Sequence, residues 1–167
     1  MTTVAEPGGR AAVVTVSSSR AAGTASDEGG PALARFADSL GLEVQVRETI
    51  TDDRELIAGL LRHLCDEVGV ALVLSTGGTG LAPGDVTPEA TRDVLEREAP
   101  GIAEAMRAAS EPHTPHWMLS RAVAGVRGGT LIVNFPGNPK AIAETGEALA
   151  PALPHALELL AGRTDAH

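Results

Sequence analysis

Short runs of β-branched and aliphatic residues alternate with longer amphipathic stretches along this chain, which predicts strands separated by helices. Strands are expected over residues 10–16, 42–48 and 70–74, followed by a hairpin within residues 120–135 whose turn lies at Arg127-Gly128-Gly129. The continuous apolar run at 70–74 is typical of a central parallel strand that is covered on both faces. The alternation at 42–48 instead favours a strand near the sheet edge.

The stretches between the strands carry helical patterns and helix-start signals. Helices are expected over residues 31–40, 53–68, from 87, from 100, and from 138 to 162 with proline interruptions. The Thr87 hydroxyl is expected to cap the third of these ahead of Pro88, and residues 17–30 and 111–117 are expected to be loops. This order predicts an α/β fold, a three-layer α/β/α sandwich around a mostly parallel sheet with one antiparallel hairpin strand.

Length, composition and charge limit the classes of function that the chain can have. With 167 residues the chain has the size of one ordinary domain, which we expect over residues 11–162 with flexible ends at 1–10 and 163–167. No apolar run approaches the ~18 residues of a membrane span and the first residues lack a signal-peptide pattern, so a cytoplasmic protein with no membrane partner is expected. A net charge of -9 and an aromatic content of 2% argue against nucleic acid as a partner.

Four polar loops follow the predicted strands. They cover residues 17–20, 51–53, 75–85 and 134–140, and each combines hydroxyls, amides, glycine or acids with the start of a helix. Ligands of open α/β sheets bind beyond the carboxyl ends of the strands, and helix starts favour anions. We therefore expect the four loops to converge on one site for a phosphate-bearing ligand.

The third loop contains the sequence Ser-Thr-Gly-Gly-Thr-Gly at residues 75–80. Its glycines allow a close backbone approach to a ligand or a positive φ, and the hydroxyls of Thr76 and Thr79 can bind phosphate oxygens or a metal-bound water. The loop lacks the Lys-Ser/Thr ending of a Walker motif, and Pro83 stands where the dinucleotide fingerprint has its last glycine. The alternative is a tight connection that needs glycine for its geometry alone.

Two aspartates and one lysine in these loops each have a structural and a functional interpretation. Asp85 is a turn-stabilising residue or a metal ligand, and Asp52 forms a capping box with Glu55 or is the second ligand. Together the two acids could hold Mg²⁺, which a nucleotide bound to a negatively charged protein would need. Lys140, the single lysine of the chain, contacts an anionic ligand or is a solvated surface residue. His113 and His116 are expected to be exposed loop residues, not a zinc site.

Four motifs together resemble the MogA/MoaB family of molybdenum-cofactor biosynthesis proteins, which includes the plant and gephyrin G domains. The motifs read STGGTG, GDVTPEAT, MLSRAVAGVRGGTLIVNFPGNPKA and ALAPALPHALELLAG, and the resemblance extends over residues 13–162. It implies an α/β sandwich that assembles as a homotrimer or a hexamer and binds molybdopterin. Active members also bind ATP with Mg²⁺ and transfer AMP to the terminal phosphate of molybdopterin, releasing pyrophosphate. The resemblance further implies a contact with the protein that inserts molybdenum.

The resemblance assigns roles to residues that match the family motifs. Asp52 and Asp85 match the acids required for the magnesium ion and catalysis, and Ser110 and Ser120 match serines on the molybdopterin side. Asp27 and Gly30 match an Asp-x-x-Gly step after the first strand. The residues expected at the nucleotide are Thr76, Gly77, Gly78, Thr79, Gly80, Pro136, Gly137, Asn138, Pro139 and Lys140.

Three positions depart from the family pattern. Ser18-Ser19 stands where many members have Ser-Asp, Gly84 stands where many have arginine, and Trp117 replaces a smaller residue. Loss of the arginine removes a phosphate contact, and the tryptophan reshapes the pterin pocket. The resemblance makes adenylylation the main hypothesis. The alternative is a non-catalytic molybdopterin carrier or scaffold of the MoaB kind, and the third hypothesis is a related domain of another pathway.

Overall fold

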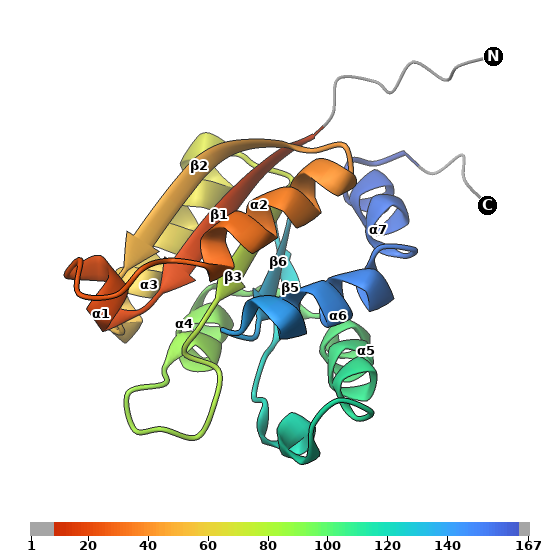
Figure 1. Cartoon of the computed structure of the whole chain (residues 1–167). Coiled ribbons are helices and arrows are strands. Elements are labelled where there is room, and N and C mark those ends of the chain that lie inside the picture. The colour runs from red at the N-terminus through yellow and green to blue at the C-terminus, as the bar shows by residue number, and fades with distance from the viewer. Residues whose placement is uncertain (1–8, 164–167) are drawn as a thin grey trace.

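The computed structural model describes residues 9–163, which are built on one six-stranded sheet (Figure 1). The strand order is β2 (Glu43–Ile50), β1 (Arg10–Val16), β3 (Leu72–Thr76), β6 (Thr130–Phe135), β5 (Ala124–Arg127) and β4 (Arg97–Glu98). The first four of these are parallel, and β5 is antiparallel to both of its neighbours. The prediction of a mostly parallel sheet with one antiparallel hairpin strand is confirmed. Of the flexible ends expected at 1–10 and 163–167, residues 1–8 and 164–167 lie outside the described residues, and Arg10 is the first residue of β1 and not part of a flexible end.

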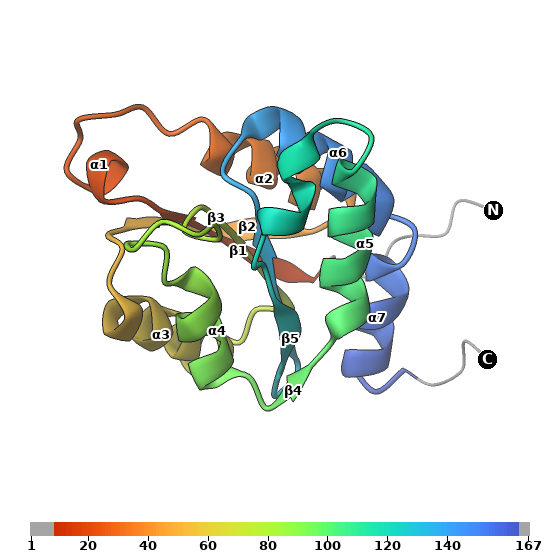
Figure 2. The ribbon, with the colours of Figure 1, turned by 90° about the horizontal axis from the view of Figure 1, so that it is seen from below.

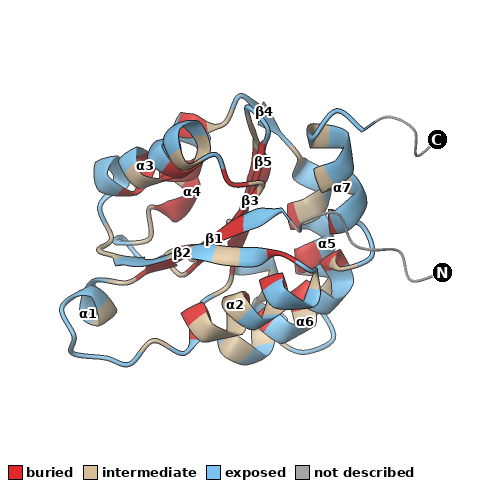
Figure 3. Ribbon diagram, turned by 90° about the horizontal axis from the view of Figure 1, so that it is seen from above, coloured by how far each residue is buried: buried red, intermediate tan, exposed pale blue. Residues whose placement is uncertain are grey.

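Helices cover both faces of the sheet and give three layers (Figures 2 and 3). On one face, core residues of the sheet pack against α2 (Gly29–Ser39), α5 (Pro100–Ser110), α6 (Pro139–Leu149) and α7 (Leu153–Leu160). On the other, they pack against α3 (Arg54–His63), the π-helix η1 (Leu64–Val68) and α4 (Thr87–Val94). Two short helices, α1 (Ser18–Ala21) and the 3-10 helix η2 (Pro115–Leu119), lie outside these layers.

The burial of β1 explains why its sequence is apolar throughout. Ala11 and Val13 face the first group of helices, whereas Ala12, Val14 and Val16 face the second, and all five are buried. A strand covered on both faces cannot alternate between apolar and polar residues. The edge strand β2 alternates between exposed and half-buried positions over most of its length, as its sequence predicted.

Several local predictions were wrong in detail. The expected loop at 17–30 contains α1, whose first turn is capped by the Ser17 side chain, and β4 was not predicted because it has only two residues. The helix expected at 53–68 ends as a π-helix, closed by Gly69 in the left-handed region. Thr87 is not a cap: it is the first residue of α4, and its hydroxyl donates instead to the Gly77 carbonyl at 2.9 Å.

The fully buried Asn134 joins three segments near the end of β6. Its Oδ1 accepts from the Val123 main-chain N–H at 3.2 Å, and its Nδ2 donates to the hydroxyls of Ser75 and Thr91 at 3.0 Å each. Buried polar groups are costly when they lose a partner. One amide therefore satisfies groups on β3, on α4 and on the segment before β5.

We expect Asn134→Ala to lower the free energy of unfolding by about 2–4 kcal/mol, because it leaves a cavity and three buried polar groups without their partner. Urea unfolding followed by circular dichroism measures the change. The matched control is Asn138→Ala, which removes one exposed helix cap and should cost about 1 kcal/mol. Equal losses in the two variants would contradict a structural role for the buried amide.

The ion pair between Arg127 and Asp66 should make stability depend on pH. The hydrogen bond from Arg127 lowers the pKa of Asp66, desolvation raises it by less, and nearby arginine charges lower it further. A depressed carboxylate pKa stabilises the fold above the ordinary aspartate pKa, and this contribution is lost as the pH falls through the folded value. Asp66→Asn should thus lower the melting temperature at pH 7, and the difference should vanish at acidic pH. In an Arg127→Ala background, the same substitution should have no such effect.

Candidate functional site

The four polar loops meet at the carboxyl end of the parallel strands, as the sequence predicted. The Ser17 main-chain N–H donates to the Ile50 carbonyl at 2.9 Å, which joins the first loop to the second. The Thr76 hydroxyl donates to the Pro136 carbonyl at 2.6 Å, which joins the third loop to the fourth. Gly77 joins the third loop to the first, because it lies directly against the Val16 carbonyl at the end of β1.

The glycine loop depends on two residues with positive φ. Gly77 has φ 96° and Gly78 has φ 69°, a region that residues with a Cβ rarely adopt. A Cβ on Gly77 would overlap the Val16 carbonyl oxygen, and one on Gly78 would overlap the Thr87 hydroxyl. The loop is held down at this point because Thr87 also donates its main-chain N–H to the Gly78 carbonyl at 3.1 Å. Glycine at these two positions is therefore required by the geometry of the loop.

Asp52 lies beside the glycine loop and is held by the first loop. Its Oδ2 accepts from both the main-chain N–H and the hydroxyl of Ser18, at 2.9 Å each. Its Oδ1 faces Gly78, 3.3 Å from where a Cβ would stand on that residue. The capping-box alternative was wrong, since Asp53 caps α3 by accepting from the Leu56 N–H at 3.0 Å. Asp52 is therefore free for another role.

Asp85 closes the far end of the same loop. Its Oδ2 accepts from the main-chain N–H groups of Gly80 and Ala82, at 3.1 and 3.2 Å. The turn-stabilising interpretation of Asp85 is thus confirmed. This role uses one oxygen of the carboxylate. Within residues 9–163, Oδ1 of Asp85 and Oδ1 of Asp52 accept no hydrogen bond.

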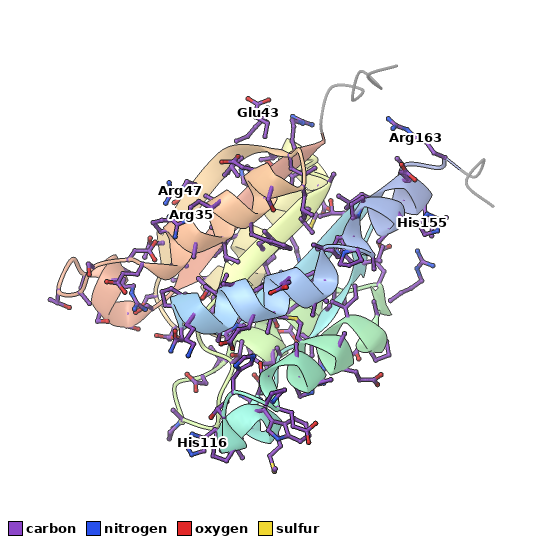
Figure 4. The ribbon with its side chains drawn as sticks, turned by 45° about the vertical axis from the view of Figure 1, so that its right-hand side comes forward. Arg35, Glu43, Arg47, His116, His155 and Arg163 are labelled. Atoms are coloured by element: carbon purple, nitrogen blue, oxygen red, sulfur yellow. The ribbon has the colours of Figure 1, made fainter. Side chains whose placement is uncertain are left out.

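These two carboxylates fit the ligand chemistry of Mg²⁺. The described part of the chain has no cluster of three or more His, Cys, Asp or Glu residues that could form a metal cage. Magnesium does not need one, because it keeps several waters and binds through one or two carboxylates and the substrate phosphates. His113 pairs with Glu144 at 3.4 Å, and His116 lies on the 3-10 helix η2 at the end of the molecule opposite Glu43 (Figure 4). Both side chains are exposed as expected, but His116 lies in a short helix and not in a loop.

The fourth loop leads into α6. Asn138 caps this helix by accepting from the Lys140 main-chain N–H at 2.9 Å. The Lys140 side chain is exposed and forms no ion pair with any residue in the described range. It thus remains available to an anion at a helix start.

A cavity of about 130 Å³ adjoins the fourth loop and brings Ser110 and Ser120 together. Its wall also includes Trp117, the residue that departs from the family pattern, and Pro136, which the Thr76 hydroxyl contacts. The cavity and the glycine loop are therefore neighbours. A larger cavity of about 580 Å³ lies at the amino end of the strands, around Arg10 and Glu43, and contains none of the predicted site residues.

Three residues of the site were not assigned a role in it from the sequence. Ser18 holds Asp52, Thr87 fixes the glycine loop, and Arg121 contacts the loop between Gly80 and Asp85. The position of Arg121 next to Ser120 in the Met-Leu-Ser-Arg motif was the available signal. Ser18 and Thr87 carried no distinguishing signal, because serine and threonine are ordinary in turns and at helix starts.

The comparisons with known proteins agree with this geometry. A family model described as "Probable molybdopterin binding domain" matches residues 12–155. The structure of the molybdopterin biosynthesis enzyme MoaB from Thermus thermophilus superimposes with a TM-score of 0.87 at 46% identity, covering 92% of this chain and 97% of that one. The chain belongs to the MogA/MoaB family.

Two curated relatives in this family are named molybdopterin adenylyltransferase. The protein of Escherichia coli K12 is 39% identical over 168 residues, covering 92% of this chain and 86% of the relative. The protein of Helicobacter pylori J99 is 46% identical over 115 residues, covering 69% of this chain and 65% of the relative. The chain thus spans slightly less than two thirds of the latter protein. No helix among residues 9–163 is long and apolar enough to cross a membrane.

We expect Gly77→Ala to lower the free energy of unfolding by about 2–4 kcal/mol, because the new Cβ would force an unfavourable φ and overlap a carbonyl oxygen. Gly84→Ala is the matched control in the same loop. Its Cβ would meet open space within the described chain, so its stability should stay within about 0.5 kcal/mol of the unmodified protein. Chemical unfolding measures both, and a similar small loss in each would contradict the geometric requirement at Gly77.

Proposed function

We propose that this protein adenylylates molybdopterin, using ATP and Mg²⁺ and releasing pyrophosphate. The observation that carries the proposal is the placement of Asp52 and Asp85, both present and each with a carboxylate oxygen free at the glycine loop. The names of the relatives from Escherichia coli and Helicobacter pylori support the same reaction.

In this proposal the triphosphate of ATP lies across the glycine loop. The N–H groups of residues 77–79 and the helix starts at Thr87 and Pro139 supply partial positive charge without a side chain. Lys140 adds a full charge beside the fourth loop, where Pro136, Gly137 and Asn138 shape the wall. These groups bind and orient the phosphates, which is the main requirement in phosphoryl chemistry.

Asp52 and Asp85 would hold the magnesium ion through their free oxygens. When bound, the ion supplies positive charge that offsets the charge on the leaving pyrophosphate. Ser18 and the N–H groups of Gly80 and Ala82 keep the two carboxylates oriented while the ligands exchange. Preorganised carboxylates of this kind need no rearrangement during the reaction.

Molybdopterin would occupy the cavity that contains Ser110 and Ser120. The two hydroxyls can bind polar groups of the ligand, while Trp117, Met106 and Ala141 provide apolar wall. Since the cavity adjoins Pro136, a phosphate extending from it reaches the glycine loop. An oxygen of that terminal phosphate then attacks the α-phosphorus of ATP, a new phosphoanhydride bond forms, and the bond to pyrophosphate breaks.

We also propose that the protein acts in the cytoplasm as a homo-oligomer, a trimer or a hexamer, and meets the protein that inserts molybdenum. Exposed apolar side chains support an interaction surface beside the site. Leu81, on the glycine loop, is 64% exposed, and Met118, on η2, is 62% exposed. Arg121, which follows η2, joins this segment to the glycine loop through its hydrogen bonds to Thr79 and Gly80.

A second candidate function is molybdopterin binding without turnover, as in a carrier or scaffold. The observation that favours it is Gly84, because many family members have an arginine at this position. Gly84 is exposed and has no side chain that could contact a phosphate. The two functions differ in whether pyrophosphate is formed.

The test incubates the protein with molybdopterin, ATP and Mg²⁺ and measures pyrophosphate. We expect Asp52→Asn and Asp85→Asn each to lower turnover by about 10²-fold or more, because each removes charge that holds the metal ion. Molybdopterin binding, followed by pterin fluorescence, should change little. Asp38→Asn, an exposed residue on α2, is the matched control and should retain full turnover.

Two outcomes would decide against parts of the proposal. Unchanged turnover in both site variants would remove the metal role of the aspartates. Tight molybdopterin binding by the unmodified protein with no pyrophosphate would favour the carrier.

A further inference from the structure

The side chain of Arg121 spans both ends of the loop that carries Asp85. Its Nε donates to the Gly80 carbonyl at 2.7 Å, and one terminal nitrogen donates to the Asp85 carbonyl at 2.7 Å. The Arg121 main-chain N–H donates to the Thr79 carbonyl at 2.8 Å. Three hydrogen bonds from one residue therefore fix the two points between which the loop extends.

The loop has little else to hold it. Its residues 81–84 are all exposed, and its internal bonds run only from Gly80 and Ala82 to the Asp85 carboxylate and from the Asp85 N–H to the Ala82 carbonyl. Internal bonds set the shape of a loop but not its position on the protein. The guanidinium provides that position, since its planar donors meet the two carbonyls in one fixed geometry.

Glu89 on α4 holds the guanidinium in place. Its carboxylate accepts a hydrogen bond from the other terminal nitrogen of Arg121, and both side chains are about one third exposed. Burial raises the pKa of Glu89, but the hydrogen bond from Arg121, its own main-chain N–H and the charges of Arg121 and Arg54 together bring it below the ordinary value. The pair is therefore ionised at neutral pH, and α4 anchors the arginine.

Each of the three guanidinium nitrogens thus donates to a protein oxygen, which uses three of the five N–H donors of the group. These donors point at Gly80, Asp85 and Glu89. The neighbouring Ser120 lines the cavity. Arg121 thus connects the Asp85 loop and α4 to the segment that carries Ser120.

We propose that Arg121, anchored by Glu89, is a positioning residue that fixes Asp85 relative to the cavity lined by Ser120. This inference rests on the proposed function, in which Asp85 holds the magnesium ion and the cavity holds molybdopterin. Loss of Arg121 lets the loop shift and lets its internal bonds to the Asp85 carboxylate open more often. Small displacements of a reacting group lower the rate strongly.

The first experiment measures the loop without using activity. Hydrogen exchange at the Gly80 and Ala82 amides reports how often the bonds to Asp85 open. We expect Arg121→Ala to increase this exchange about 10-fold or more, Glu89→Gln to increase it less, and Arg121→Lys to fall between Arg121→Ala and the unmodified protein. Arg92→Ala is the matched control, because it removes an arginine on α4 from an exposed ion pair with Glu98. An increase no larger than that of the control would overturn the proposal.

The second experiment measures catalysis in the same variants. We expect Arg121→Ala to lower kcat/KM for ATP about 100-fold and to raise the Mg²⁺ concentration needed for half-maximal rate, with molybdopterin binding retained and partial rescue by Arg121→Lys. A purely structural role would lower the folded fraction and leave the Mg²⁺ dependence of the folded protein unchanged. That result, or unchanged kcat/KM despite faster exchange, would overturn the positioning role.

The proposed function can fail separately. If the unmodified protein forms no pyrophosphate, the adenylylation proposal fails. Binding of a non-hydrolysable ATP analogue with Mg²⁺ then replaces kcat/KM as the readout. Weaker binding in Arg121→Ala than in Arg92→Ala would support the positioning role, and equal binding would overturn it.

Discussion

The common level at which three parallel strands end is the constraint on which the site depends. Thr15 on β1 pairs with Thr76 on β3, and Thr76 pairs with Phe135 on β6. Each of these strands ends within one or two residues of this level. The loops that follow β3 and β6, which are 60 residues apart in sequence, therefore start side by side. A shift of one residue in this register would turn every side chain of the shifted strand to the other face, and a shift of β6 would separate Asn134 from Ser75 and Thr91. The core packing of both faces therefore also fixes the site.

The loops stabilise one another because none is held by its own residues alone. Asp52 is oriented by Ser18 from the first loop, and Gly77 lies under the Val16 carbonyl only because its positive φ permits it. Asp85 is oriented by its own turn, which Arg121 fixes from the segment before β5. A carboxylate held by several neighbours keeps its direction when a charged ligand binds. The same dependence means that a change in one loop should be felt in the others.

The sequence predicted what local patterns determine and missed what long-range contacts determine. The apolar run at 70–74 identified a central strand and the alternation at 42–48 an edge strand, because burial on two faces or one sets these patterns. The sequence placed the capping box at Asp52 because Glu55 lies three residues later, whereas Asp53 caps α3 and Asp52 is bonded to Ser18. The residues around Thr87 match the pattern of a helix cap, but its hydroxyl bonds to the Gly77 carbonyl. Local sequence patterns do not predict such a contact. Ser110 and Ser120 line one cavity, and their assignment to molybdopterin stays a prediction.

The charge of the protein explains why the proposed site relies on the backbone. A chain with a net charge of -9 repels ATP and molybdopterin phosphates, and Arg121 directs its donors at protein oxygens. Lys140 is one remaining cation near the glycine loop, and Gly84 adds none where many relatives have arginine. Main-chain N–H groups, helix starts and an ion between Asp52 and Asp85 must then supply most of the positive potential. Without the ion, Asp52 and Asp85 would increase the repulsion between the protein and the nucleotide phosphates. Their presence therefore favours a site that binds the nucleotide together with magnesium.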